Sequence, residues 1–139
     1  MKKLMFVAVL ALIAHVGFGQ TATATVKSDL GEFEWAEATH DFGKIKQGVP
    51  VTFEFKFTNK GKAPLVIVNA QPSCGCTTPS WTREPVMPGG EGYVKATFNA
   101  GAIGPFDKTV TVTANIESGV VTLHIKGEVL QPEMAVKPN

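Results

Sequence analysis

The sequence has few of the residues and motifs on which enzyme chemistry usually depends. Its 139 residues include two cysteines, three histidines, two tryptophans and one tyrosine. No serine lies in a Gly-x-Ser-x-Gly motif, and the four-ligand pattern of a zinc site is missing. The glycine-rich stretch 89–92 is a turn rather than a phosphate cradle, because no helix pattern follows it. We therefore predict that the protein is not an enzyme and needs no cofactor.

The sequence also lacks an apolar run long enough for a permanent membrane span, which needs about 20 residues. The apolar run 4–18 is shorter and follows Lys2 and Lys3. A positive start, a short apolar stretch and small residues at its end predict a helical signal peptide over residues 1–19, cleaved before Gln20. We expect export to the periplasm or the extracellular space, with no stable membrane span after cleavage.

No strong charge of either sign is present. Loss of residues 1–19 removes two lysines, so Lys+Arg falls from 13 to 11 against 12 Asp+Glu, and the net charge becomes −1. A nucleic-acid partner usually needs a clustered positive field, so we expect none. The 120 residues that remain are enough to bury a core without help from disulfides.

The chain after the signal peptide alternates between polar connections and short β segments. Residues 20–34 are low in complexity and read as a linker, for which a short helix and a disordered tether both stay open. In 51–58, Val51 and three phenylalanines alternate with polar residues, which predicts a half-buried strand. Residues 65–70 are nearly all apolar and predict a second strand. The proline-containing stretch 71–79 is expected to be a loop.

Further short β segments continue this pattern to the end of the domain. They lie at about 80–82, 93–98, 106–115 and 121–129, with Gly- and Pro-rich turns between them. About seven strands without a helix predict an all-β fold, an immunoglobulin-like β-sandwich over residues 35–130. Residues 131–139 are expected to form a frayed tail. Both cysteines lie in one loop, so apolar burial alone must hold the two sheets together.

Several phrases resemble one known family. They are His40 to Gly48, Phe57 to Gly61 with Pro64-Leu65, Pro72 to Thr77, Pro88 to Glu91, and Gly104 to Val112. Over about residues 36–129 they resemble the bacterial family called domain of unknown function 1573, which is similar to the ASPM, SPD-2 and Hydin group and to major sperm protein. The resemblance implies an immunoglobulin-like fold and export, and it implies no known activity.

The most chemical feature is the pair Cys74 and Cys76. Separated only by Gly75, whose backbone freedom suits a tight ring, they can close a small disulfide that staples the loop. They can also present two thiolates to a soft metal such as Cu(I) or Zn, or take part in redox exchange. His40, His124 and Met87 are the only residues that could assist, and none is close in sequence. The pattern defines no particular metal.

A binding surface is the other candidate site. Trp35, Trp81 and Tyr93 could line a groove, although such residues more often pack in cores or interfaces. We predict a non-catalytic binding or scaffolding module of the bacterial cell envelope, whose partner is another envelope protein. The alternative is a thiol-based copper-binding or redox protein that acts through Cys74 and Cys76. The sequence sets neither the identity of the partner nor the oligomeric state.

Overall fold

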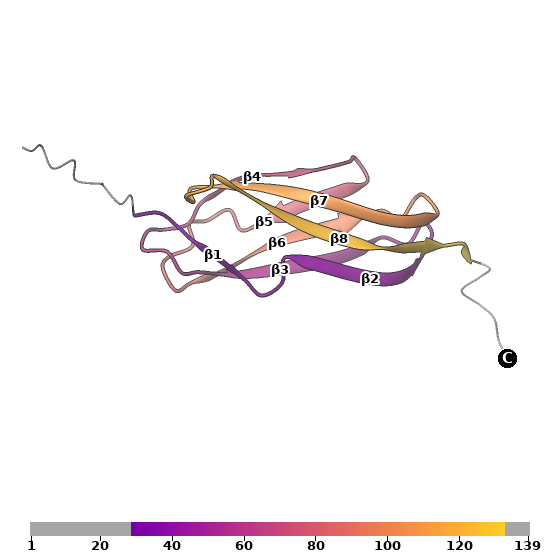
Figure 1. The fold of residues 1–139 in the computed structure, drawn as a ribbon, viewed down its shortest axis with the longest axis horizontal. Helices are drawn as coiled ribbons and strands as arrows, with labels where there is room; N and C mark the ends of the chain where they lie inside the picture. The colour runs from indigo at the N-terminus through magenta and orange to yellow at the C-terminus, as the bar shows by residue number, and fades with distance from the viewer. Residues whose placement is uncertain (1–28, 133–139) are drawn as a thin grey trace, which may run out of the picture.

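The computed structural model describes residues 29–132 as eight strands in two layers (Figure 1). The predicted signal peptide 1–19 and residues 133–139 lie outside the described part. The strands are β1 (Phe33–Trp35), β2 (Thr39–Lys46), β3 (Val51–Asn59), β4 (Ile67–Pro72), β5 (Thr77–Trp81), β6 (Glu91–Phe98), β7 (Gly104–Ala114) and β8 (Val120–Leu130). The predicted all-β sandwich is confirmed, with eight strands instead of about seven. Within residues 29–132, no helix has the length and apolar character to cross a membrane.

Each layer is a four-stranded sheet. The first has the order β1-β3-β6-β5 and the second has the order β2-β8-β7-β4. All pairs are antiparallel except β2 with β8, which run parallel. The two sheets pack face to face around one apolar core, which includes Phe55, Leu65, Val94, Val112 and Leu123, all at most 1% exposed. This core is built without a disulfide between the sheets.

The alternation predicted for residues 51–58 is confirmed in β3. Phe55 and Phe57 are buried, whereas Lys56 between them is exposed. Their partners on β6 continue the same inward face, since Phe55 pairs with Val94 and Phe57 with Gly92. A Cβ at Gly92 would lie only 2.5 Å from the ring of Phe57, so this position has room for glycine alone.

The predicted limits of the second strand and of the following loop are wrong. β4 starts at Ile67 and continues to Pro72, while Leu65 forms an isolated bridge with Val86. The predicted loop 71–79 shrinks to residues 73–76, because β5 begins at Thr77. Prolines caused this error. β4 and β5 are sheet edges, where a missing backbone N–H costs no ladder hydrogen bond.

The domain also begins earlier in the chain than Trp35. β1 starts at Phe33, within the segment interpreted as linker, and Gly31 before it is buried. The Gly31 N–H donates to the carbonyl of Asn115, which lies between β7 and β8, at 3.2 Å. The last residues of that segment are therefore part of the sandwich.

Candidate functional site

One buried side chain, that of Asn59, fixes the end of the sandwich at which β1 begins. Its Nδ2 donates to the carbonyls of Ala63 (2.9 Å) and Val86 (2.8 Å), and its Oδ1 accepts from the N–H groups of Glu32 (3.2 Å) and Gly61 (2.9 Å). The side chain thus uses both of its donors and both acceptor positions. Asn59 is 0% exposed, and its side chain joins the residue before β1 to the β3–β4 connection.

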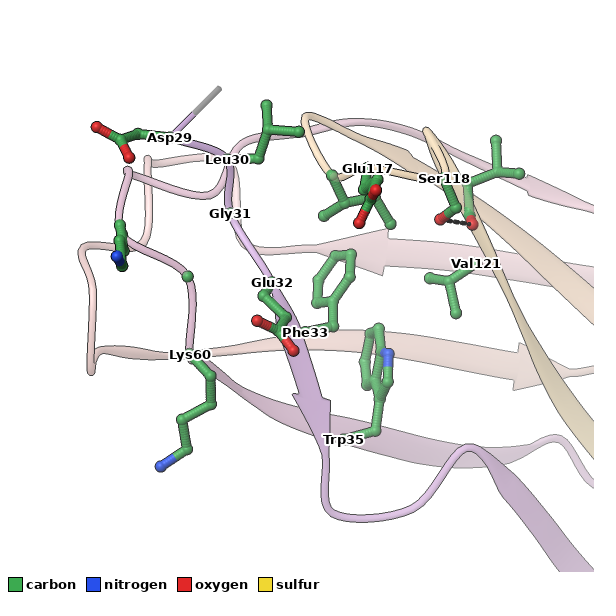
Figure 2. A pocket seen from close by; sticks show the side chains of 14 residues that line it. Asp29, Leu30, Gly31, Glu32, Phe33, Trp35, Lys60, Glu117, Ser118 and Val121 are labelled. Carbon is green, nitrogen blue, oxygen red and sulfur yellow. Dashed lines mark hydrogen bonds between the residues drawn. The ribbon is translucent and has the colours of Figure 1, made fainter. Parts of the chain in front are cut away.

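A groove runs beside β1, between the edges of the two sheets. Its volume is about 870 Å³, and Figure 2 shows the rings of Phe33 and Trp35 on one side and Val121 on the other. Phe33 stacks on Trp35 with ring centres 4.6 Å apart, and both rings meet Phe57 edge-on. Ile116 also lines the groove. The floor is therefore apolar, while charged side chains at its rim include Asp29, Glu32, Lys60, Lys62 and Glu117.

The β1 strand turns a free backbone edge toward this groove. Ala36 N–H donates to Lys56, and Lys60 N–H donates to Glu32, so even-numbered residues of this segment bond to β3. Antiparallel pairs alternate between bonded and non-bonded, so the N–H and C=O groups of Phe33 and Trp35 point away from β3. Within residues 29–132 β1 pairs only with β3, and no backbone hydrogen bond of the turns and loops reaches these groups.

The first residues of β8 have a second free edge on the other side of the groove. Ala114 N–H donates to Gly119, which places Thr122 among the residues whose backbone groups point away from β7. The parallel partner β2 reaches β8 only at His124, whose N–H donates to Ala38 at 2.9 Å. The Ser118 hydroxyl donates to the Val120 carbonyl at 2.8 Å, the dashed line in Figure 2, so that group is already paired.

The other three edge strands carry devices that discourage strand pairing. β4 contains Pro72 and β5 contains Pro79, and neither residue has a backbone N–H. β2 is interrupted by a bulge between Asp41 and Lys44. Prolines and bulges are two of the ways in which natural sheets blunt their edges. β1 is short, with three residues, but it has neither a proline nor a bulge, so the outward backbone groups of Phe33 and Trp35 stay free to pair.

The three aromatic residues predicted to form a binding surface do not come together as one set. Trp35 and Tyr93 both line a shallow hollow of about 400 Å³ over Gly92. Trp81 lies on β5, at the opposite edge of the same sheet, with the guanidinium of Arg83 3.7 Å above its ring. The indole N–H groups of Trp35 and Trp81 are buried and have no hydrogen-bond partner within residues 29–132.

The two cysteines are joined as a disulfide in the loop between β4 and β5. Their Cα atoms are 5.2 Å apart, within the usual range for a disulfide. Gly75 between them is exposed, and its φ is outside the left-handed region, so the ring does not use the backbone freedom that we expected of it. The described residues contain no cluster of three or more His, Cys, Asp or Glu side chains that could hold a metal.

The histidines considered as helpers of the cysteines are engaged elsewhere. His40 stacks on Phe53 with ring centres 3.6 Å apart, and its Nδ1 lies 3.1 Å from a carboxylate oxygen of Glu37. His124 Nδ1 lies 3.4 Å from a carboxylate oxygen of Asp107. The geometry therefore gives the cysteine loop and the groove as two separate candidate sites.

The fold and its open groove define a small immunoglobulin-like β-sandwich domain. Residues 33–129 match the family described as proteins of unknown function, DUF1573, and the chain belongs to that family. This confirms the resemblance drawn from the sequence phrases. No curated protein matches the chain at a significant level.

Solved structures with the same fold come from bacteria and from humans. A protein of unknown function from Porphyromonas gingivalis W83 is similar with a TM-score of 0.65 and 17% identity, over 78% of this chain and 51% of that one. The ASH/PapD-like domain 7 of human CEP192 is similar with a TM-score of 0.57 and 13% identity, over 84% of this chain and 98% of that one. The secreted serine protease VesC from Vibrio cholerae is similar with a TM-score of 0.54 and 14% identity, over 74% of this chain and 24% of that one. The chain thus spans about half the length of the Porphyromonas protein, and at these identities the likeness shows the fold alone.

Proposed function

We propose that the protein is a non-catalytic binding module of the bacterial cell envelope, exported by residues 1–19, which takes an extended polypeptide segment into the groove between β1 and β8. The observation that carries this proposal is the free backbone edge of β1 beside the groove. The N–H and C=O groups of Phe33 and Trp35 are spaced as on any strand and can pair with a further strand.

The groove also indicates which kind of segment would bind. Successive side chains of a strand point to opposite faces, so alternate residues of a bound segment would face the apolar floor. That floor consists of Phe33, Trp35, Val121 and Ile116. We therefore expect a partner segment with apolar residues at every second position and polar residues between them, which face the charged rim.

Site-specific cross-linking in the native host tests this proposal. A photoreactive residue replaces Val120 beside the groove, and the matched control replaces Val68, an exposed valine on the edge strand β4. We expect cross-links to one defined segment from position 120 and not from position 68. Equal capture at both positions would contradict a groove-specific partner.

The captured segment is then synthesised and added to the purified protein, and backbone amide exchange is measured. Strand pairing should slow exchange at the amides of Phe33, Trp35 or Thr122 by about tenfold or more, because these groups gain hydrogen bonds. Protection elsewhere, with these amides unchanged, would show that the segment binds another surface.

Peptide mapping of the N-terminus of the protein from the same host tests export, and a chain that still begins at Met1 would contradict it.

A further inference from the structure

We propose that Cys74 and Cys76 form a reversible thiol–disulfide exchange site, in which a dithiol partner attacks Cys74 and the Thr77 hydroxyl stabilises the departing sulfur of Cys76. The inference does not depend on the binding groove. A structural disulfide usually joins residues that are far apart in the chain, whereas this one closes a ring with only one residue between the cysteines. A ring this short removes little entropy from the unfolded chain.

Hydrogen bonds already hold the loop without the disulfide. Ser73 N–H donates to the Thr109 carbonyl at 2.9 Å, and Thr109 N–H donates back to the Ser73 hydroxyl at 3.0 Å. On the other side of the pair, Asn99 N–H donates to the Cys76 carbonyl at 3.0 Å. These bonds anchor the loop to β7 and to the residue that follows β6. The two sulfurs therefore stay close to each other after the bond between them is broken.

The loop is open where a partner would approach. Gly75 is exposed, and apart from its neighbours Cys74 and Cys76 no residue has an atom within 4 Å of an ideal Cβ placed on it. Neither packing nor backbone conformation requires glycine at this position. The exposed glycine places no side chain between the two cysteines, and this favours the approach of an incoming thiolate to the loop.

The two sulfurs differ in their surroundings, and the difference sets the direction of attack. Both cysteines are half-buried, but of the two only Cys76 is among the residues that pack against the apolar core. Thr77 is 3% exposed, and its hydroxyl lies 3.8 Å from the sulfur of Cys74 and 3.9 Å from that of Cys76. Within residues 29–132 these sulfurs are its only side-chain hydrogen-bond partners. A hydroxyl held there can donate to a thiolate as it forms.

The exchange balances as follows for a partner with two thiols. The first partner thiolate bonds to Cys74 Sγ, the Cys74–Cys76 bond breaks, and Cys76 Sγ leaves with the electron pair. The second partner thiolate then attacks the partner sulfur of the mixed disulfide, and Cys74 Sγ leaves as a thiolate. Both cysteines end as thiols after taking protons, so the pair gains two electrons and two protons that the partner dithiol loses.

Glutathione serves as the probe of the first step. The purified native protein is treated with excess reduced glutathione, new thiols are alkylated, and the products are mapped by mass spectrometry. We expect glutathione on Cys74 and the alkyl group on Cys76, with a preference of about tenfold or more, because Cys76 packs against the apolar core. Preference for Cys76 would overturn the direction. A disulfide that reacts only after the protein is unfolded would overturn the site.

Dithiothreitol tests the complete exchange, and variants of Thr77 test the positioning role. The protein should be reduced fully and reversibly while its circular dichroism and melting stay those of a folded domain. Thr77→Val, which keeps the shape and removes the hydroxyl, should slow reduction about tenfold, the effect expected for a hydrogen bond to a charged group. Thr77→Ser should restore the rate. Equal rates in all three proteins would show that the hydroxyl has no part in the exchange.

Discussion

The two ends of the sheet that contains β6 are held in opposite ways. At the first end, beside Glu91, one buried amide side chain organises the chain through four hydrogen bonds. At the other, where Thr77 pairs with Phe98, a covalent bond joins Cys74 and Cys76. The non-covalent device connects three segments, whereas the covalent one connects residues already fixed by other bonds. We therefore expect the polar network to contribute more to the stability of the fold than the disulfide, for which we proposed a role in thiol–disulfide exchange.

The apolar core lies between these two ends, and a substitution there should lower the free energy of unfolding more than a substitution at either end. Phe55 is 0% exposed in the middle of β3, so Phe55→Ala should lower the free energy of unfolding by about 3–5 kcal/mol through lost burial and a cavity. Lys56→Ala, on the exposed face, should change it by no more than about 0.5 kcal/mol. Denaturant unfolding monitored by tryptophan fluorescence measures both. Similar losses in the two variants would contradict the facing of β3.

The next largest loss of stability is expected when the side chain of Asn59 is removed. Asn59→Ala removes four hydrogen bonds, one buried and three part-buried, and leaves a cavity at a fully buried position, which should cost about 2–4 kcal/mol. Asn115 is the matched control, since it accepts from Val66 N–H (2.7 Å) and donates to the Pro64 carbonyl (2.9 Å) but is exposed. Water can replace those bonds, so Asn115→Ala should cost about 1 kcal/mol or less. Equal costs would show that burial does not distinguish the two side chains.

Sequence patterns predicted the middle of the molecule better than its edges. The alternation around Phe55 reflects burial on one face, which a local pattern records, and the all-β sandwich follows from repeating it along the chain. β1 was missed because it has only three residues and depends on pairing with β3. Pro72 and Pro79 predict a loop when only the local sequence is considered, whereas edge strands tolerate proline.

The candidate sites were only partly predictable for a related reason. Cys74 and Cys76 are visible as a motif, and a disulfide was one of the outcomes that spacing allowed. The contact of both sulfurs with the Thr77 hydroxyl depends on how the loop is folded. The groove arises because β1 and the start of β8 belong to different sheets and leave a gap between their edges. Of the three predicted aromatic residues only Trp35 lines it, since its position depends on long-range pairing.

The disulfide end should respond much less to mutation than the Asn59 end. Replacing Cys74 and Cys76 together with Ser should lower the free energy of unfolding by about 1 kcal/mol or less, because the closed ring is so short. The melting temperature should fall by about 4–8 °C at most for a domain of this size. Differential scanning calorimetry of the parent and the variant measures this shift. A double variant that fails to fold would reverse the contrast drawn between the two ends.

The smallest effect is expected at Gly75, and a second glycine provides the contrast. Gly75→Ala should change the free energy of unfolding by no more than about 0.5 kcal/mol, since the added methyl meets open space and φ is not left-handed. At the Asn59 end, a Cβ on Gly61 would collide with the backbone of Leu30 and lie 2.6 Å from the Glu32 nitrogen. Gly61→Ala should therefore cost about 1–3 kcal/mol, as expected for overpacking that forces the backbone to move.

Thermal and denaturant unfolding of the two alanine variants compares the ends with the same added methyl group. Amide exchange of the β1 residues adds a local readout, because displacement of the chain at Leu30 should loosen β1 in Gly61→Ala and leave it unchanged in Gly75→Ala. If Gly75→Ala were the more damaging change, the cysteine loop would be packed more tightly than its exposed glycine indicates. If it keeps full stability but reacts more slowly with glutathione, the glycine serves access to the disulfide rather than folding.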